Sequence, residues 1–351
     1  MTSSTIDDTG VVTQRPAPLP TPRGPASAAV VAVLRERSPE GDPAGLMAKA
    51  IGQADDLLRD DDVQLAAFCL YELHYGGFRG VPDTLEWDAD LLTARAIFEG
   101  AFEAELRRRA PRVDRPAPRA EDVAHALFRL TEADDGPSLS QYVARKATQE
   151  QLREFLIQRS LYTLKEADPH SWGIPRLTGR AKAALVEIQS DEYGAGRPHR
   201  MHSAIFARTM RAAGLDPSYG AYLDQVGASL YASLNTMSLF GLNRRLRGAL
   251  VGHLAAFEMT SAVPNRFYGN GFRRLGFDEE ATWYFDEHVE ADAVHEQIAA
   301  RDLAGGFVEA EPNLLGDVLF GASACLYADG LAGADLLQAF TESRSSLYRP
   351  A

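Results

Sequence analysis

Long helix-forming segments dominate this chain. From Ser27 onward, Ala, Leu, Glu and Arg fill most positions, and Gly or Pro separates one segment from the next. Few runs alternate β-branched and polar residues in the way that half-buried strands do. We therefore predict an all-α fold. The predicted helices cover residues 27–37, 42–57, 61–75, 88–109, 120–132, 138–166, 176–193, 199–213, 219–239, 244–262, 264–275, 279–303, 312–328 and 331–347.

Two Pro-rich segments divide the chain. Residues 1–26 contain five prolines between positions 16 and 25, which are too closely spaced for a helix, so we predict a disordered tail. A second stretch, rich in Pro and Arg, covers 109–119. It predicts a connection between an N-terminal helical segment, 27–110, and a larger helical domain, 120–347.

Composition limits the class of partner. The net charge of -13 and the pI near 5.1 provide no global basic field, so the sequence argues against nucleic-acid binding as a main function. The two cysteines, Cys69 and Cys325, form neither a disulfide framework nor a CxxC metal motif. We find neither an unbroken apolar run of membrane-spanning length nor a signal peptide, so we expect a cytoplasmic protein without a membrane partner.

One polar stripe predicts a metal site. His288, Asp292 and His295 stand at i, i+4 and i+7, which places them within roughly 60° of one another on a helix. Two imidazoles and a carboxylate on one face suit iron, manganese or zinc. The same segment carries four further acidic residues, so an acidic surface helix is the alternative.

Ligands on one helix need partners from facing helices. Glu166 and Glu258 each stand on a mainly apolar helix face, where a buried carboxylate needs a cation or metal beside it. A solvent-exposed position is the alternative for each of them. A regular helix would place Glu192 and His202 about 15 Å apart, but two glycines and a proline between them allow a break that returns His202 towards Glu192. His199 competes with His202 for this role. The other histidines lack a partner pattern: His74, His125, His170 and His253.

Four motifs occur in a fixed order along the chain. They are Lys165-Glu-Ala-Asp168, then Asp191-Glu-Tyr-Gly-Ala-Gly196 followed by His202, then Ala256-Phe-Glu258, then the segment from Tyr284 to His295. Together they resemble the haem-oxygenase-like diiron oxidases and oxygenases, often described as iron-containing redox enzymes. The resemblance covers residues 120–345 and implies a haem-oxygenase-like helical bundle with an N-terminal helical extension.

The resemblance also implies a site and an activity. It assigns seven ligands to two iron ions: Glu166, Glu192, His202, Glu258, His288, Asp292 and His295. A third histidine, here matching His288, is typical of the branch that oxygenates nitrogen, and that branch also carries a dimer-forming extension. The implied protein is a homodimeric, non-haem diiron oxygenase of specialised metabolism. It would use dioxygen and an external electron donor to convert an amine, guanidine or amino-acid-derived small molecule to a hydroxylamine, nitroso or nitro product.

Alternatives follow from the same residues. A diiron oxidase could instead desaturate its substrate, decarboxylate it oxidatively or cleave a C–C bond, and a metal-binding helical scaffold would catalyse nothing. A haem-binding function rests on fold analogy alone. Four aromatic residues flank the implied ligands and could line a pocket, although aromatics beside a bundle core usually serve packing: Tyr193, Phe257, Tyr284 and Phe285.

Overall fold

Helices form all the regular secondary structure in the part of the chain described here. The computed structural model describes residues 16–36, 42–132 and 138–348, except for the side chains of residues 290–293. An isolated β-bridge joins Ala17 to Phe78. The α-helices, with one π-helix called η8, are α1 (Pro25–Glu36), α2 (Pro43–Gln53), α3 (Asp61–Glu72), α4 (Ala89–Arg109), α5 (Ala120–Glu132), α6 (Leu139–Arg145), α7 (Gln149–Thr163), α8 (Asp168–Ser171), α9 (Gly179–Glu192), α10 (His202–Ala212), α11 (Ala228–Leu242), α12 (Arg247–Met259), α13 (Ala262–Arg274), α14 (Glu279–Gln297), η8 (Ile298–Gly305), α15 (Gly306–Ala310) and α16 (Leu315–Thr341).

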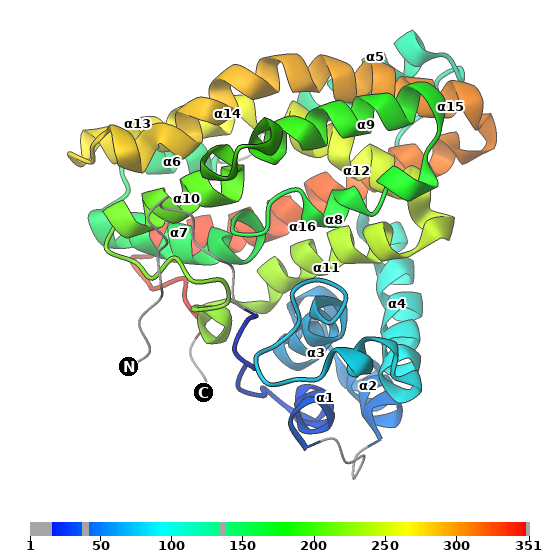
Figure 1. The fold of residues 1–351 in the computed structure, drawn as a ribbon, viewed down its shortest axis with the longest axis vertical. Coiled ribbons are helices and arrows are strands. Elements are labelled where there is room, and N and C mark those ends of the chain that lie inside the picture. Colours follow the sequence, from blue (N-terminus) through cyan, green and yellow to red (C-terminus); the bar gives the residue numbers. More distant parts are fainter. Residues whose placement is uncertain (1–15, 37–41, 133–137, 349–351) are drawn as a thin grey trace.

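The long helix α16 runs through the middle of the bundle (Figure 1). It packs against α11 and α12, while α14 packs against α10, α12 and α13. The N-terminal helices α1 to α4 form a group at one end, where α3 packs against α11. The all-α prediction is therefore confirmed.

The N-terminal helices share a hydrophobic core with the bundle. One cluster of buried side chains includes Val30 and Phe68 from the N-terminal group together with Phe155, Tyr231 and Phe285 from the bundle. A second cluster lies between α5, α9, α12, η8 and α16. The predicted connection at 109–119 thus joins two parts whose apolar side chains are continuous.

Local sequence chemistry fixes the helices that lead into the site. Thr148 and Gln151 form a reciprocal capping box at the start of α7. The Asp278 carboxylate accepts a hydrogen bond from the Ala281 amide and begins α14. Both caps satisfy amides that the first helical turn leaves without partners.

Several predicted helix boundaries were wrong. The helix predicted at 138–166 is divided into α6 and α7, because Thr148 caps a new helix, and α7 ends at Thr163. The helix predicted at 219–239 begins only at Ala228, and the one predicted at 279–303 becomes a π-helix after Gln297. The helices predicted at 312–328 and 331–347 form the single helix α16.

The predicted disordered tail was too long. Residues 1–15 lie outside the described part of the chain, but Ala17 is buried and its carbonyl accepts a hydrogen bond from the Arg79 amide at 2.8 Å. The Thr21 amide and hydroxyl both donate to Asp224. Prolines prevent a helix here, yet an extended segment can still pack on a surface.

By length and composition alone, the helical stretch Pro312–Thr341 could cross a membrane, and it is the one such stretch among the residues described. Half of its apolar window is buried inside the protein, against α11 and α12. Core packing accounts for this apolarity.

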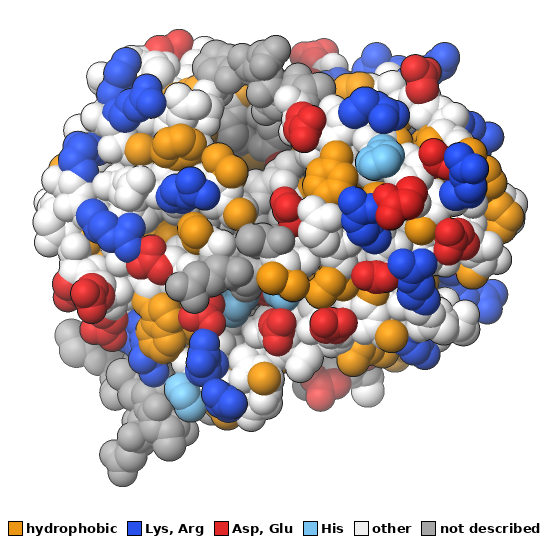
Figure 2. All heavy atoms as spheres, turned by 90° about the horizontal axis from the view of Figure 1, so that it is seen from above, with side chains coloured by type: hydrophobic (Ala, Val, Ile, Leu, Met, Phe, Trp, Pro, Cys, Tyr) orange, Lys and Arg blue, Asp and Glu red, His pale blue; other side chains and the backbone are white. Residues whose placement is uncertain are grey.

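Acidic and basic side chains alternate over the face in Figure 2 without segregating into a basic patch.

Candidate metal centre

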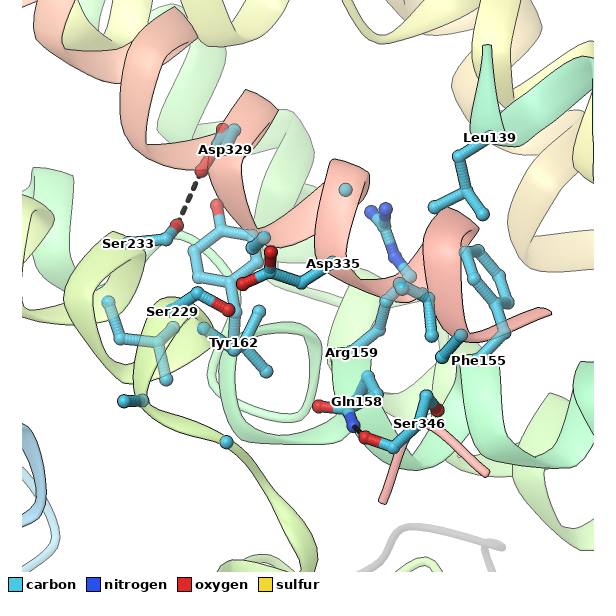
Figure 3. Close-up of a pocket in the computed structure, with 18 of the residues that line it drawn as sticks. Leu139, Phe155, Gln158, Arg159, Tyr162, Ser229, Ser233, Asp329, Asp335 and Ser346 are labelled. Atoms are coloured by element: carbon cyan, nitrogen blue, oxygen red, sulfur yellow. Dashed lines mark hydrogen bonds between the residues drawn. The ribbon is translucent and has the colours of Figure 1, made fainter. Parts of the chain in front are cut away.

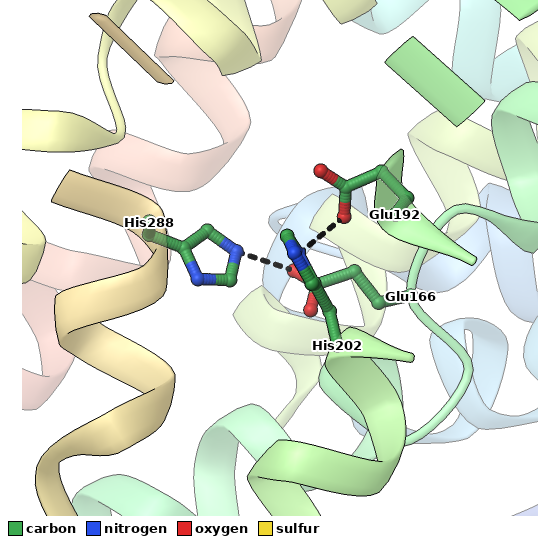
Figure 4. Close-up of side chains that lie close together, drawn as sticks. All are labelled: Glu166, Glu192, His202 and His288. Carbon is green, nitrogen blue, oxygen red and sulfur yellow. Dashed lines mark ion pairs between the residues drawn. The ribbon is translucent and has the colours of Figure 1, made fainter. Parts of the chain in front are cut away.

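The structure brings six of the seven implied ligands into two adjoining clusters. Glu166, Glu192, His202 and His288 form the first cluster (Figure 4), and Glu192, Glu258 and His295 form the second. Within each cluster, one potential ligand atom of every residue lies within 4.8 Å of the others. All six side chains are buried. Glu192 belongs to both clusters.

Asp292 is the seventh implied ligand. Its backbone lies in α14 between His288 and His295, but its side chain lies outside the described residues. Its role stays a prediction.

Helix ends and one break position these side chains. Glu166 stands in the turn between α7 and α8, followed by Ala167 in the left-handed conformation at φ 76°. Glu192 is the last residue of α9 and His202 the first of α10. The intervening Gly194 has φ 67°, and a Cβ there would lie 2.6 Å from the Arg200 carbonyl carbon, so the tight return requires glycine.

In the first cluster, imidazole nitrogens face carboxylate oxygens. His202 Nδ1 lies 2.7 Å from Glu192 Oε2, and His288 Nε2 lies 3.7 Å from Glu166 Oε1. The His202 and His288 ring centroids are 4.4 Å apart. The turn after α7, the end of α9, the start of α10 and one face of α14 thus bring potential metal-binding atoms into one small volume.

In the second cluster, His295 Nδ1 lies 3.4 Å from Glu258 Oε2 and 3.9 Å from Glu192 Oε1. The two oxygens of Glu192 therefore face different histidines, since Oε2 is the oxygen beside His202. A carboxylate in this position can bridge two metal ions.

Outer hydrogen bonds orient the ligands. The Tyr284 hydroxyl donates to both oxygens of Glu166, at 2.8 and 3.0 Å. His288 Nδ1 lies 2.7 Å from the Tyr284 carbonyl oxygen, so this nitrogen carries the proton and leaves Nε2 as the metal-binding atom. His295 Nε2 lies 3.1 Å from Asp191, which likewise directs Nδ1 to the cluster.

The buried carboxylates favour positive charge in the site. Burial opposes the charge on His295, but Glu258, Asp191 and Glu192 outweigh burial and raise its pKa to about 10. Burial likewise opposes the charge on Glu166, but His288, His202 and the Tyr284 hydroxyl lower its pKa below the ordinary value. A bound cation would meet the same electrostatic demand.

The donor set fits iron. His202 Nδ1 is buried without a hydrogen-bond partner in the described structure, although it lies 2.7 Å from a Glu192 oxygen. An imidazole nitrogen and a carboxylate oxygen that converge without hydrogen-bond geometry are positioned to share a cation. The donors are carboxylate oxygens and imidazole nitrogens, which suit iron or manganese, and no cysteine belongs to either cluster.

Comparison with known proteins now assigns the chain. The profile of a family described as "Iron-containing redox enzyme" matches residues 153–330, just over half of the chain. The chain belongs to this family. A curated relative, a nitrosourea synthase from Streptomyces achromogenes subsp. streptozoticus, is 28% identical over 158 residues. That match covers 45% of this chain but only 34% of the relative.

The four predicted pocket residues of this iron-containing redox enzyme lie in different surroundings, and only some of them contact the metal-binding side chains. Phe257 lines the space between the ligands, and the Tyr284 hydroxyl contacts Glu166. The half-buried Tyr193 donates a hydrogen bond to Asp168 at 2.8 Å. Phe285 packs on Phe272 in the hydrophobic core with ring centroids 5.0 Å apart, and its role as a pocket residue stays a prediction. Its position one residue after Tyr284 turns it to another face of α14.

Two histidines that have no partner pattern in the sequence lie near the centre of this iron-containing redox enzyme. His170 and His253 are buried with ring nitrogens 3.0 Å apart, and His170 lines the space between the ligands. Burial lowers the pKa of His170 to about 4, so it is neutral near pH 7. His199, the competitor of His202, is exposed. The His170–His253 pair is 83 residues apart in sequence, which leaves no local spacing to detect.

Proposed function

We propose that this protein is a non-haem diiron oxygenase that uses dioxygen to oxidise a nitrogen atom of a small amine, guanidine or amino-acid-derived substrate. The observation that carries the proposal is the pair of buried His and Glu clusters joined by Glu192. Two adjoining sites with a shared carboxylate suit two metal ions, whereas one ion would need only one of them.

Each cluster would hold one iron. Glu166, His202 and His288 would bind the first ion, Glu258 and His295 the second, and Glu192 both. Asp292 would complete the set. Bound iron would supply the capacity to activate dioxygen with electrons from an external donor.

The protein's own groups would fix and shield this centre. The Tyr284 hydroxyl holds Glu166, while the Tyr284 carbonyl and Asp191 set the tautomers of two histidines. Tyr162 and Phe257 lie over the ligands with ring centroids 5.2 Å apart. This aromatic pair would shield the metal centre from bulk water.

Oxidation of nitrogen is favoured by two features. His288 adds a third imidazole to the ligand clusters, which is the feature that the resemblance associates with nitrogen oxygenation. The name of the nitrosourea synthase describes formation of a product that contains oxidised nitrogen. The match covers about a third of that relative, so its activity supports a reaction class for this chain and no specific substrate.

An anaerobic iron titration tests the proposal. Wild-type protein should bind two Fe(II) per chain, and His288→Ala should bind the iron of the first cluster more weakly. Exposure to oxygen with a panel of amines, guanidines and amino acids should then add oxygen to nitrogen, detected by mass spectrometry. Binding of one iron, or loss of hydrogen or carbon dioxide in place of oxygen gain, would contradict it.

A further inference from the structure

A large cavity lies within the helical bundle (Figure 3). Its volume is about 610 Å³, within the range of small-molecule sites. Most of its wall comes from α7, α11, α16 and residues 344–347 of the C-terminal segment. None of the six implied metal ligands whose side chains are described lines it.

The cavity and the metal centre share a wall. Tyr162 and Phe257 line the cavity, and they also line the small space bounded by Glu166, Glu192, Glu258 and His288. These two aromatic rings meet edge to face. A small molecule bound in the cavity would therefore contact one side of the Tyr162–Phe257 pair, and the metal-binding side chains lie on the other side.

Arg159 lines this cavity with a guanidinium group that has no ion-pair partner among the described residues. Its guanidinium lies 5.6 Å from the Phe155 ring centroid and 5.7 Å from that of Tyr268. Its buried Nε has no hydrogen-bond partner in the described part of the chain. Burial opposes the charge on Arg159, but Tyr284, Tyr268 and Glu166 outweigh burial and raise its pKa. The Nε donor without a partner is suited to bind a carboxylate.

Asp329 lines the cavity with a carboxyl group that has no ion-pair partner among the described residues. It accepts a hydrogen bond from the Ser233 hydroxyl. Burial raises its pKa, while Arg159 opposes that effect from nearby. The other charged side chains of the wall have ion-pair partners: Arg59 with Asp335, Asp61 with Arg23, and Arg344 with Glu342.

We propose that this cavity is the substrate site, in which Arg159 binds a carboxylate of the substrate and Asp329 binds its ammonium group. The inference rests on the proposed function and narrows the substrate to a polar amine that also carries a carboxylate, such as an amino acid. Polar side chains recur along the wall beside its apolar residues and can bind further polar groups of such a substrate: Gln158, Ser229, Ser233, Ser345 and Ser346. The part of the substrate nearest Tyr162 and Phe257 would be the part that reacts.

Calorimetric titration of anaerobic, Fe(II)-loaded protein tests the site. The probes are the standard amino acids and the matching amines without a carboxylate, such as lysine with cadaverine and arginine with agmatine. At least one amino acid should bind more tightly than its amine. Arg159→Gln should lower the affinity for that amino acid about 10- to 100-fold and leave the affinity for its amine unchanged. Arg159→Lys should restore part of the lost affinity. Asp329→Asn should weaken binding of both the amino acid and its amine.

Arg344→Gln is the matched control, because it removes a paired positive charge from the same wall. It should leave binding unchanged. Equal binding of every acid and its amine, or no binding of any probe, would overturn the proposal. Binding of dodecanoate in place of amino acids would overturn the role of Asp329.

Iron content and turnover separate this inference from the proposed function. Amino-acid binding that depends on Arg159, in a protein with two irons but no oxygen transfer to nitrogen, would keep the site and reject the activity. If Arg159→Gln leaves both KM and kcat of nitrogen oxidation unchanged, the activity would be kept and the proposed substrate site rejected.

Discussion

Asp191 acts on the candidate metal centre without belonging to either cluster. Its carboxylate lies 3.1 Å from His295 Nε2, and its side chain is 56% exposed, so it stands at the border between the centre and solvent. The contact directs His295 Nδ1 towards Glu258 and Glu192. Outer partners of this kind commonly hold a histidine in the orientation that metal binding needs.

Asp191→Ala should weaken iron binding at the second cluster. Because His295 loses its orienting partner, we expect about a 10- to 100-fold loss of affinity for one of the two irons, with little loss of folding stability. Fe(II) titration against a competing chelator measures this. Glu187→Ala, at an exposed position on the same helix α9, is the control. Equal iron affinity of the two variants would contradict the role of Asp191.

Single residues differ in how far the sequence reveals them. His288 and His295 were found because both lie on one helix, where spacing alone fixes their common face. Asp191 stands 104 residues before its partner His295, and Tyr284 stands 118 residues after Glu166. Such pairs depend on how α9, α14 and the turn after α7 pack, which local spacing does not encode.

At the level of elements, the crossing of α12 and α16 depends on two glycines. A Cβ at Gly252 would lie 1.8 Å from the Val318 carbonyl oxygen, and one at Gly321 would lie 2.0 Å from the Ala249 carbonyl oxygen. The two backbones therefore lie in direct contact. Because α12 also carries Glu258, this close crossing fixes the position of the Glu258 side chain along the bundle axis.

Gly252→Ala should destabilise the protein by about 3 kcal/mol or more, because backbone atoms of α16 cannot move away as a flexible side chain would. Gly330→Ala is the control on α16, where no atom lies within 4 Å of the added Cβ. It should be neutral or stabilise by up to about 1 kcal/mol. Chemical denaturation measures both. Similar stabilities of the two variants would contradict the close crossing.

The helices themselves were largely predictable, and their boundaries were not. Pattern located the helical segments because helix-forming residues are interrupted by Gly and Pro. It failed at Thr148, where a side-chain cap begins α7, and at Gly330, which continues as helix because α16 packs within the bundle. Tertiary packing outweighs the helix-breaking tendency of an isolated glycine.

At the scale of the whole molecule, a buried ion pair joins the N-terminal helices to the metal centre. Lys165 Nζ lies 2.6 Å from a carboxylate oxygen of Glu72, the last residue of α3, and the Tyr219 hydroxyl donates to the same oxygen at 2.8 Å. The ammonium also lies 4.3 Å from the Tyr75 ring centroid. Lys165 directly precedes Glu166, so α3 holds the turn that presents this ligand.

Removal of one partner of this pair should cost about 3–5 kcal/mol of folding stability, because the other charge stays buried without compensation. We therefore expect Lys165→Met to unfold at lower denaturant concentration than wild type. The double variant E72L/K165M should recover much of the loss, since neither charge is then left buried alone.

Iron affinity separates anchoring from stability. If the ion pair positions Glu166, the double variant should bind iron at the first cluster about 10-fold more weakly than wild type even where its stability has recovered, while the second cluster keeps its affinity. The second cluster is the internal control, because Glu258 and His295 stand on α12 and α14, away from the turn that Lys165 holds. Equal losses at both clusters would indicate general loosening of the bundle. Full iron affinity in a stable double variant would mean that α3 contributes packing to the fold but does not position Glu166.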